Sequence, residues 1–442
     1  MRNSLYTLLL LALILPQGAS AARLWSSGCE FQSDLPGNGL NTLLEFTDGV
    51  ATSTNGNATV YTAIKHSGNS SCRFNAAAAD GTIQARTMYL QTQTATDQYF
   101  RFYFYIVSAP DEDAAIFQVW DRGIDGWEGG LVLETDRQLH WANDEGATDG
   151  QGTTVLATGQ WYRIEINYDA VDQVLVYVDG AQEFDSGAHT GDSVDTMNLD
   201  LCDNTPITCG ADGIAQGEWL FDDVAMNDTA GTAQTGLPGA GNIVYMQPDS
   251  AGDGNGCSAG DSTSIDELTP DDATTICVLD ADVGGDIIDV NAESSSNAGI
   301  DSYDTITLIL VGLRASGASA ATYAYNARIK SAAGGTTSSG SALSRAVTTY
   351  QTNGGTANVV GAYTLASYTD PTTAVAWTPT GTNSLDNMQI GANASDGNPN
   401  VHVSTIWALV EYLDGAAPST ALTPHDVING TMIINTGTVI LK

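Results

Sequence analysis

The sequence predicts an all-β protein made of two antiparallel β-sandwich domains in tandem. Three observations predict this class. Apolar and polar side chains alternate with a period of two residues in many short segments, and turns rich in Gly, Asn, Asp and Thr separate those segments. No segment keeps a helical period for longer than a turn or two. A chain of 442 residues is long for one sandwich and of ordinary length for two.

Residues 1–21 predict a cleaved signal peptide. A short basic lead is followed by an apolar run from Leu5 to Leu15, which is too short to span a bilayer comfortably, and then by the cleavage sequence Ala19-Ser20-Ala21. The mature protein is therefore expected to begin at Ala22 and to be secreted, either into the extracellular space or onto the cell surface. No other apolar run approaches membrane length and no lipoprotein box is present, so we expect no membrane insertion.

The charge of the chain excludes two classes of partner. Lys and Arg number 14 against 52 Asp and Glu, which gives a net charge of −38. Binding to nucleic acid or to an anionic membrane would be electrostatically unfavourable. We interpret the acidity as a source of solubility in the extracellular medium, with calcium binding as the alternative.

Six cysteines in an exported chain indicate disulfides. Six cysteines can pair in fifteen ways. Proximity along the sequence favours the pairing of Cys29 with Cys72, Cys202 with Cys209, and Cys257 with Cys277. The pair Cys202 and Cys209 could form half of a zinc site, but no second Cys or His pair lies nearby, so we favour a disulfide there as well.

The first domain is predicted over residues 22–228, and its clearest element is the segment 161–180, WYRIEINYDAVDQVLVYVDG. Two alternating runs flank a polar turn in this segment, which is the pattern of a β-hairpin with one face in a core. The pair Asp179-Gly180 tolerates positive backbone angles and predicts a return strand through residues 182–184. The other predicted strands are Thr87 to Gln91, Tyr99 to Val107, Ala115 to Trp120, Gly130 to Glu134, Gln138 to Trp141 and Trp219 to Met226. Because Tyr99 to Val107 is apolar or aromatic at nearly every position except Arg101, we expect it to be a central strand that is covered on both faces.

The order of these strands resembles a known fold. It is similar to the concanavalin A-like lectin/glucanase sandwich in its laminin-G-like form. The similarity lies in the aromatic-rich strand, the motif Trp161-Tyr162-Arg163-Ile164-Glu165, the motif Val176 to Gly180 and the closing Trp219 to Val224. The resemblance covers residues 22–228. It implies a fold and not a function, because that fold hosts lectins, enzymes and structural modules.

A linker is predicted over residues 229–241, and a second sandwich over residues 242–414. Its predicted strands are Asn242 to Gln247, Asp286 to Val290, Thr305 to Val311, Ala321 to Ile329, Arg345 to Tyr350, Val359 to Leu365, Asn387 to Ile390 and His402 to Tyr412. About eight strands with short turns suffice for a jelly-roll or similar sandwich. Asp249 to Pro270 is rich in Gly, Asp and Ser and is expected to be a loop. This half resembles, more loosely, the jelly-roll sandwich of phage and environmental structural proteins.

The C-terminal residues 415–442 form a proline-marked linker and a tail whose segment 431–441, TMIINTGTVIL, has no charge. An apolar β-rich terminus should not be left in water. It either folds back as a last hairpin of its own domain or is donated to an open sheet in the next subunit. The candidate assembly residues are Thr431, Met432, Ile433, Ile434, Val439, Ile440 and Leu441.

No catalytic set is found, and we predict that the protein is not an enzyme and binds no cofactor. Laminarinase-like members of the resembled fold use two carboxylates at alternate positions of one strand. This chain has Glu134 and Asp136 followed by Gln138, whose amide cannot act as a general acid. We therefore interpret Thr135 to Arg137 as a hairpin turn.

A glycan-binding loop is the remaining candidate site. The segment from Trp120 to Glu128 combines aromatic and acidic side chains, as in lectin loops that calcium often fixes. The candidate residues are Trp120, Asp121, Asp125, Trp127 and Glu128. In the alternative interpretation, Trp120 is the inward end of a strand and Trp127 is a plug over the core.

Two functions follow from these observations. The leading hypothesis is a secreted structural protein that polymerises with itself by β-strand donation into a filament or surface assembly, since head-to-tail contacts do not close. The alternative is a glycan-binding adhesin or carbohydrate-binding module that recognises extracellular glycans.

Overall fold

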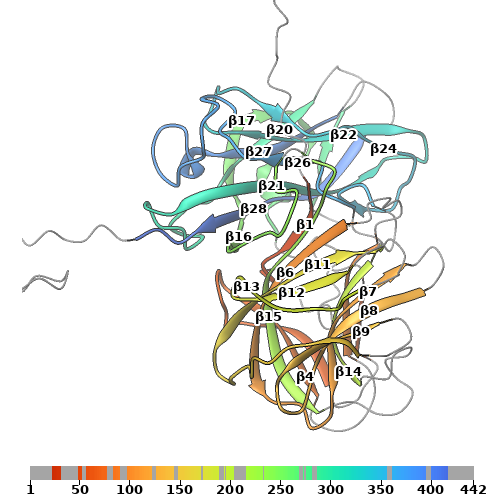
Figure 1. Ribbon diagram of the computed structural model, residues 1–442. Helices are drawn as coiled ribbons and strands as arrows, with labels where there is room; N and C mark the ends of the chain where they lie inside the picture. The colour runs from red at the N-terminus through yellow and green to blue at the C-terminus, as the bar shows by residue number, and fades with distance from the viewer. Residues whose placement is uncertain are drawn as a thin grey trace, which may run out of the picture.

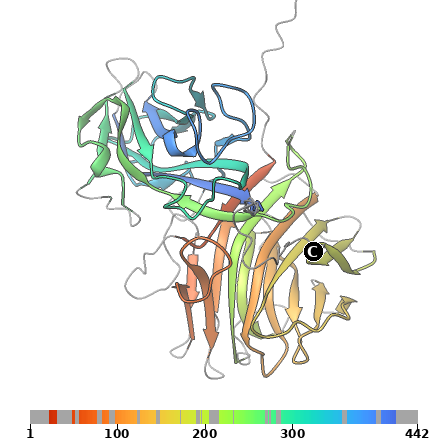
Figure 2. The same ribbon diagram turned by 90° about the vertical axis from the view of Figure 1, so that its left-hand side faces the viewer.

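The structure is a computed structural model that describes residues 22–30, 48–51, 56–76, 83–89, 97–121, 126–143, 148–170, 173–188, 194, 196–203, 216–231, 233–267, 272, 275–280, 286–355, 361–394 and 400–416. Strands dominate the described chain, and short 3-10 turns such as Ser262–Ser264 interrupt them. The strands form four antiparallel sheets, which pair into two sandwiches. Figures 1 and 2 show the sandwiches as two lobes that meet along one side of the first. The predicted fold class is confirmed.

The first sandwich consists of two sheets, sheet I and sheet II. Sheet I has the order β13 (Ala181–Asp185), β12 (Val174–Val178), β11 (Trp161–Asp169), β6 (Asp97–Ser108), β15 (Gly217–Asp228), β4 (Ser71–Ala76) and β3 (Gly56–Tyr61), and β1 (Arg23–Ser27) also pairs with β15. Sheet II has the order β10 (Thr148–Gln151), β9 (Leu139–Asn143), β8 (Gly126–Leu133), β7 (Ala114–Asp121), β14 (Thr196–Asp203), β5 (Ile83–Tyr89) and β2 (Asp48–Ala51).

The second sandwich consists of sheets III and IV. Sheet III has the order β18 (Cys257–Ala259), β19 (Cys277–Leu279), β28 (Val401–Leu413), β21 (Thr305–Gly317) and β25 (Gln351–Thr352), with β16 (Asn242–Met246) on β28 and β26 (Leu365–Ser367) on β21. Sheet IV has the order β17 (Pro248–Asn255), β20 (Ile287–Ala292), β27 (Gln389–Ala394), β22 (Tyr323–Lys330) and β23 (Ser338–Ser339), with β24 (Leu343–Arg345) on β22.

Alternation along the strands fills the core between sheets I and II. The inward residues of β6 are fully buried, and Phe102 stacks on Phe117 of sheet II with ring centroids 5.6 Å apart. The predicted hairpin is present, with β11 and β12 in register from Ile164 opposite Val178 to Tyr168 opposite Val174. Strand β6 is central, as predicted, and its outward tyrosines are half-buried.

Three local predictions in the second sandwich are wrong. One is the strand Val359 to Leu365, because residues 361–364 form no strand and β26 begins only at Leu365. Residues 249–270 were expected to form a loop, but they contain most of β17 and all of β18. A sheet-edge strand needs backbone partners more than apolar side chains, and most side chains of β17 face solvent. Conversely, β24 ends at Arg345 and the alternating residues 346–350 form no strand, because their side chains remain largely outside the core.

Two predicted disulfides are confirmed. Cys29 bonds Cys72 and Cys257 bonds Cys277, with Cα atoms 5.4 and 5.3 Å apart. Cys209, the predicted partner of Cys202, lies outside the described residues. The signal peptide and the assembly residues 431–441 also lie outside them.

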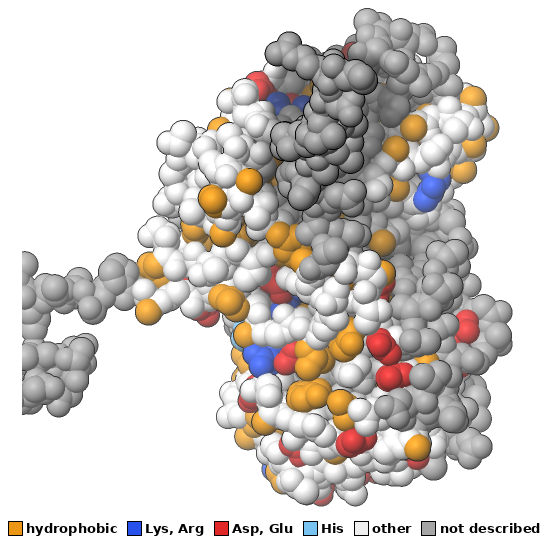
Figure 3. Space-filling view, turned by 45° about the horizontal axis from the view of Figure 1, so that its top comes forward, with side chains coloured by type: hydrophobic (Ala, Val, Ile, Leu, Met, Phe, Trp, Pro, Cys, Tyr) orange, Lys and Arg blue, Asp and Glu red, His pale blue; other side chains and the backbone are white. Residues whose placement is uncertain are grey.

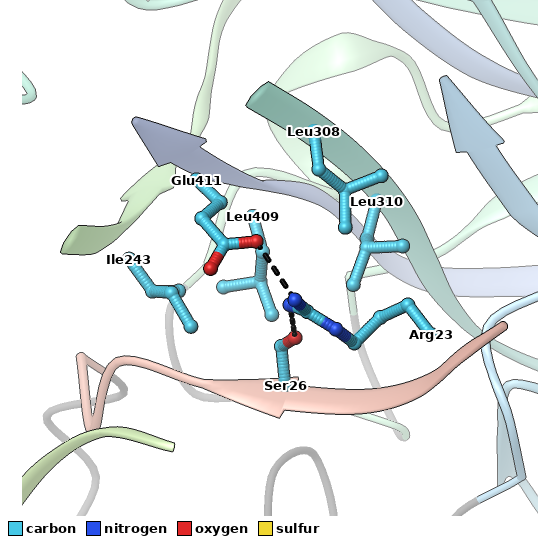
Figure 4. Close-up of a pocket in the computed structure, with 7 residues that line it drawn as sticks. All are labelled: Arg23, Ser26, Ile243, Leu308, Leu310, Leu409 and Glu411. Carbon is cyan, nitrogen blue, oxygen red and sulfur yellow. Dashed lines mark hydrogen bonds and ion pairs between the residues drawn. The ribbon is translucent and has the colours of Figure 1, made fainter. Parts of the chain in front are cut away.

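A buried ion cluster joins the two sandwiches, and we call this contact the seam. Glu411 on β28 contacts Arg23 on β1 at 2.9 Å and Arg101 on β6 at 2.5 Å. Figure 4 shows Arg23 and Glu411 pointing toward each other across a small hollow between the sandwiches. Asp223 adds a second link by accepting a hydrogen bond from the backbone of Ile243 at 2.5 Å. The second sandwich therefore covers part of the outward face of sheet I and leaves sheet II on the opposite side of the first sandwich.

Candidate functional site

The candidate site lies on the outward face of sheet II. Every second residue of its strands points inward, and Phe117, Leu131 and Trp141 are examples that are fully buried in the core. The residues between them must therefore point outward. On β7, β8, β9 and β14 these outward residues are polar or aromatic: Gln118, Trp120, Glu128, His140, Thr196, Asn198 and Asp200.

Strand register brings these side chains together. Asn198 on β14 lies opposite Gln118 on β7, and Gln118 lies opposite Gly130 on β8. Gly130 in turn lies opposite Ala142 on β9. One row across the sheet therefore holds two amide side chains, on β14 and β7, and then a glycine and an alanine, on β8 and β9.

Trp120 is fixed to this face by hydrogen bonds. Its indole Nε1 donates to Gln118 Oε1 at 3.0 Å. With the Asn198 amide oriented so that its nitrogen donates to the backbone oxygen of Met197, its oxygen accepts from the same indole at 3.0 Å. The ring is half-buried, so it is anchored through its nitrogen while part of its surface remains open.

A β-bulge positions the acidic side chain beside Trp120. The register between β7 and β8 shifts between Val119 and Trp120. Gly129, at φ 144°, takes a backbone conformation that L side chains rarely adopt, and a Cβ there would lie 2.7 Å from the Trp141 ring. Glu128, next to it, is therefore directed to the outward face.

The residues Glu134, His140 and Gln151 form a second polar group at the far side of the sheet. Glu134 Oε1 lies 2.8 Å from His140 Nδ1, and Gln151 Nε2 donates to both oxygens of Glu134 at 3.0 Å. The predicted hairpin turn is confirmed, because Arg137 donates its backbone N–H to the carbonyl of Glu134 and has φ 71°. Asp136 accepts a hydrogen bond from the backbone of Gln138 within the same turn.

The burial of the outward polar groups is unusual for a sandwich surface. Asn198 is 1% exposed, Glu128 5% and Gln118 6%. Polar side chains on an outward face are ordinarily hydrated, whereas these converge in an enclosed region next to a half-buried tryptophan. Convergent, enclosed polar groups with an aromatic neighbour are typical of a small-ligand site.

The structure places four of the five predicted glycan-loop residues in two paired strand ends. Trp120 lies opposite Trp127, and Asp121 lies opposite Gly126. Both tryptophans are half-buried, so both interpretations of this loop stay predictions. Glu128 faces the same surface as Trp120. Asp125 lies outside the described residues.

Sequence analysis missed Gln118 and Asn198. The spacing of Gln118 and Trp120, two residues apart on one strand, was available as a signal. Asn198 could not be found in the same way, because its position depends on the pairing of β14 with β7, which are far apart in the chain.

Metal-ligand clusters and membrane-spanning helices are both absent from the described residues. These residues contain no group of three or more His, Cys, Asp or Glu side chains arranged to hold a metal ion. No helix in the described part of the chain is long and apolar enough to cross a bilayer.

Comparison with known proteins gives structural likenesses at low similarity. No family model matches the chain, and no curated protein matches it. "Cellulose induced protein, Cip1" is 15% identical with a TM-score of 0.32, and the match covers 42% of this chain and 89% of that one. A carbohydrate-binding module, CBM66 from Bacillus subtilis, is 11% identical with a TM-score of 0.27, over 40% of this chain and 99% of that one.

A sialidase is a third similar structure, at 12% identity and a TM-score of 0.30. The match covers 42% of this chain and 19% of the sialidase, so the chain corresponds to a small part of that protein. At these TM-scores the concanavalin A-like form of the first sandwich stays a prediction. The laminin-G-like form, and the likeness of the second half to phage structural proteins, stay predictions.

Proposed function

We propose that the protein is an exported, non-catalytic glycan-binding protein, and that the outward face of sheet II in its first sandwich holds the sugar. The observation that carries the proposal is the hydrogen-bonded group of Trp120, Gln118 and Asn198, with Glu128 beside it. It supplies an aromatic surface, amides and a carboxylate within one enclosed region.

Each of these groups suits a sugar. The face of a pyranose ring is apolar and packs on an indole, which presents a large rigid surface. Hydroxyl groups at the ring edge both donate and accept hydrogen bonds, which matches amides and a carboxylate. The indole N–H of Trp120 already donates to the two amide oxygens, so the side chain is held in place before a ligand arrives. The entropy cost of ordering this side chain on binding is therefore small.

The absence of catalysis is part of the proposal. Glu134 is the acidic residue nearest to the pattern expected of glucanases, and its carboxylate is bonded to His140 and Gln151. Asp136 is committed to its own turn. Neither arrangement resembles a pair of carboxylates placed on opposite sides of a glycosidic bond.

Strand donation into a filament was the leading hypothesis from the sequence. Its donor segment lies outside the described residues, so no structural observation favours it, and it stays a prediction. We therefore place glycan binding first.

The test is binding of the mature chain, residues 22–442, to an immobilised glycan panel, followed by calorimetric titration of any sugar that binds. Trp120→Ala should weaken binding by about tenfold or more, since it removes the stacking surface and the anchor of both amides. Gln118→Ala should weaken it to a lesser degree.

Tyr303→Ala is the matched control, because Tyr303 is an exposed aromatic residue of the second sandwich. Equal affinity of the Trp120→Ala variant and the wild type for a bound glycan would contradict the proposed site. Thermal unfolding of each variant would establish that it remains folded.

A further inference from the structure

A second group of aromatic side chains lies on the outward face of sheet I, on the opposite side of the first sandwich from Trp120. It consists of Tyr103 and Tyr105 on β6, Trp161 on β11 and His66, and we call it the aromatic ledge. Trp161 lies opposite Tyr105 in the strand register, and their ring centroids are 5.2 Å apart. His66 stacks on Tyr103 at 3.6 Å and meets Trp161 edge-on at 5.7 Å.

Exposure distinguishes Trp161 from most tryptophans of this protein. The chain has eight, and five of them are buried: Trp25, Trp141, Trp219, Trp377 and Trp407. The half-buried ones are Trp120 and Trp127, which belong to the site on sheet II, and Trp161. Tyr103 and Tyr105 are also half-buried. A tryptophan that is neither in the core nor in the first site, and that lies beside two tyrosines, is a candidate ligand surface.

The ledge is held rigidly at the end nearest the seam. His66 Nδ1 lies 2.6 Å from Asp223 Oδ2, and the backbone N–H of His66 donates to Asp222 at 2.7 Å. Both carboxylates are buried. The rings are therefore ordered before any ligand binds, which favours binding.

Polar groups border the ledge on both sides. Arg163 lies opposite Tyr103 on the neighbouring strand, and its Nε donates to Glu165 at 3.0 Å. Across β15, Glu218 accepts hydrogen bonds from Arg73 at 2.7 Å and from Asn75 at 2.8 Å. The Trp161 and Tyr105 rings are tilted by 55° to each other and form two walls of an angle, in which a pyranose ring can pack its face on one ring and its edge against the other. The hydrogen-bonding side chains at the border suit the hydroxyl groups of the sugar.

The surrounding charge favours a neutral sugar over an acidic one, because the net charge of the chain is −38. Few cations occur in this chain, and the view in Figure 3 shows Lys and Arg at only a few places on the described surface. Arg163 and Arg73 are two of these cations, and each has a carboxylate partner that offsets its charge. Both kinds of sugar share the pyranose face that the rings would contact.

We propose that the aromatic ledge is a second carbohydrate-binding surface, which takes one pyranose ring of a polysaccharide on Trp161 and Tyr105. It uses none of the residues of the site on sheet II. Since the two surfaces lie on opposite sheets, both can be occupied at once, and the protein can then bind two chains or two stretches of one chain.

The test uses the mature chain labelled with fluorotryptophan, whose Trp161 and Trp120 fluorine resonances are assigned with the variants Trp161→Phe and Trp120→Phe. Cellohexaose serves as the neutral probe, an oligoguluronate as the acidic probe, and glycerol as a control that has hydroxyls but no ring. We expect a saturable shift of the Trp161 resonance with at least one saccharide and none with glycerol. The saccharide that produces the shift identifies the neutral or the acidic class.

Two variants separate this proposal from the one for sheet II. The Trp161 shift should persist in Trp120→Ala, and Tyr105→Ala should weaken it by about tenfold in apparent affinity. A shift of the Trp120 resonance alone would overturn the ledge and leave the first site intact. If the Trp161 resonance does not move with either saccharide, or moves equally with glycerol, the ledge is not a carbohydrate-binding surface.

Discussion

Replacing Glu411 with Gln should destabilise the protein by about 3 kcal/mol, and the seam explains why. Glu411 is the carboxylate between Arg23 and Arg101, whose side chains are both 0% exposed. Glutamine keeps the size and shape of the side chain but removes its charge. Two buried guanidinium groups then lose their counter-charge, which is costly away from solvent.

The magnitude follows from what remains around each arginine. Removing one partner of a buried ion pair typically costs about 3–5 kcal/mol. Arg23 keeps hydrogen bonds to Asn227 at 2.6 Å and to Ser26 at 2.8 Å. Arg101 keeps hydrogen bonds to the backbone oxygens of Asp223 at 3.0 Å and Gly239 at 3.1 Å. These neutral acceptors place the loss at the lower end of the range.

The loss should also depend on pH. Burial alone would raise the pKa of Glu411, but attraction from Arg23 and Arg101 outweighs burial, and the pKa lies below the ordinary value of 4.5. A carboxyl group with a lowered pKa stabilises the fold above its unfolded pKa, and this contribution is lost as the pH falls through the folded value. The difference between the wild type and Glu411→Gln should therefore be full at neutral pH and shrink in acid.

Urea unfolding and calorimetry of the mature chain measure this loss. Glu218→Gln is the matched control, because the pair of Glu218 with Arg73 is partly exposed and should be worth at most about 1 kcal/mol. A triple variant with Arg23→Met, Arg101→Met and Glu411→Leu removes every charge and should be more stable than Glu411→Gln. A Glu411→Gln variant within about 1 kcal/mol of the wild type, a loss no greater than that of the control, would show that the ion cluster does not stabilise the seam.

Two further predictions concern a disulfide and a buried carboxyl. Replacing Cys257 and Cys277 with Ser removes a bond that spans 20 residues, and should lower the free energy of unfolding by about 3 kcal/mol; an unchanged calorimetric midpoint would contradict this. Burial, followed by repulsion from Asp223 and Glu30, raises the pKa of Asp222 well above the ordinary 3.8. Stability should therefore fall as the pH rises from 3.8 through the folded pKa of Asp222, and Asp222→Asn should flatten this dependence in denaturation measured at several pH values. Parallel pH profiles of the two proteins would show that another group is responsible.

Local patterns explain which parts of the fold were predictable. The meander of β11, β12 and β13 was found because the alternation, a polar turn and the turn at Asp179-Gly180 occur within one short stretch. The same holds for the turn at Thr135 to Arg137. Strand β17 was missed because the sheet edge stabilises it through backbone pairing, which leaves no apolar pattern in its side chains.

The candidate site was predictable only in part, for a related reason. Trp120 and Glu128 are close in sequence and were found together. The bond between Trp120 and Asn198 depends on strand order, which side-chain periodicity does not encode. Arg101 stood out in the sequence as the exception in an apolar strand. Its explanation is Glu411, which is 310 residues away.

The seam also has a consequence for the order in which the chain can fold. Strand β1 pairs with β15, so the described strands of the first sandwich are all available once residue 228 has been made. Its Arg23 and Arg101 still lack their common partner, because Glu411 lies on the last described strand. During synthesis the first domain therefore keeps Arg23 and Arg101 without the carboxylate that they share until the end of the second domain has been made. The final strand thus completes both domains, and a chain that stops before it leaves each of them unfinished.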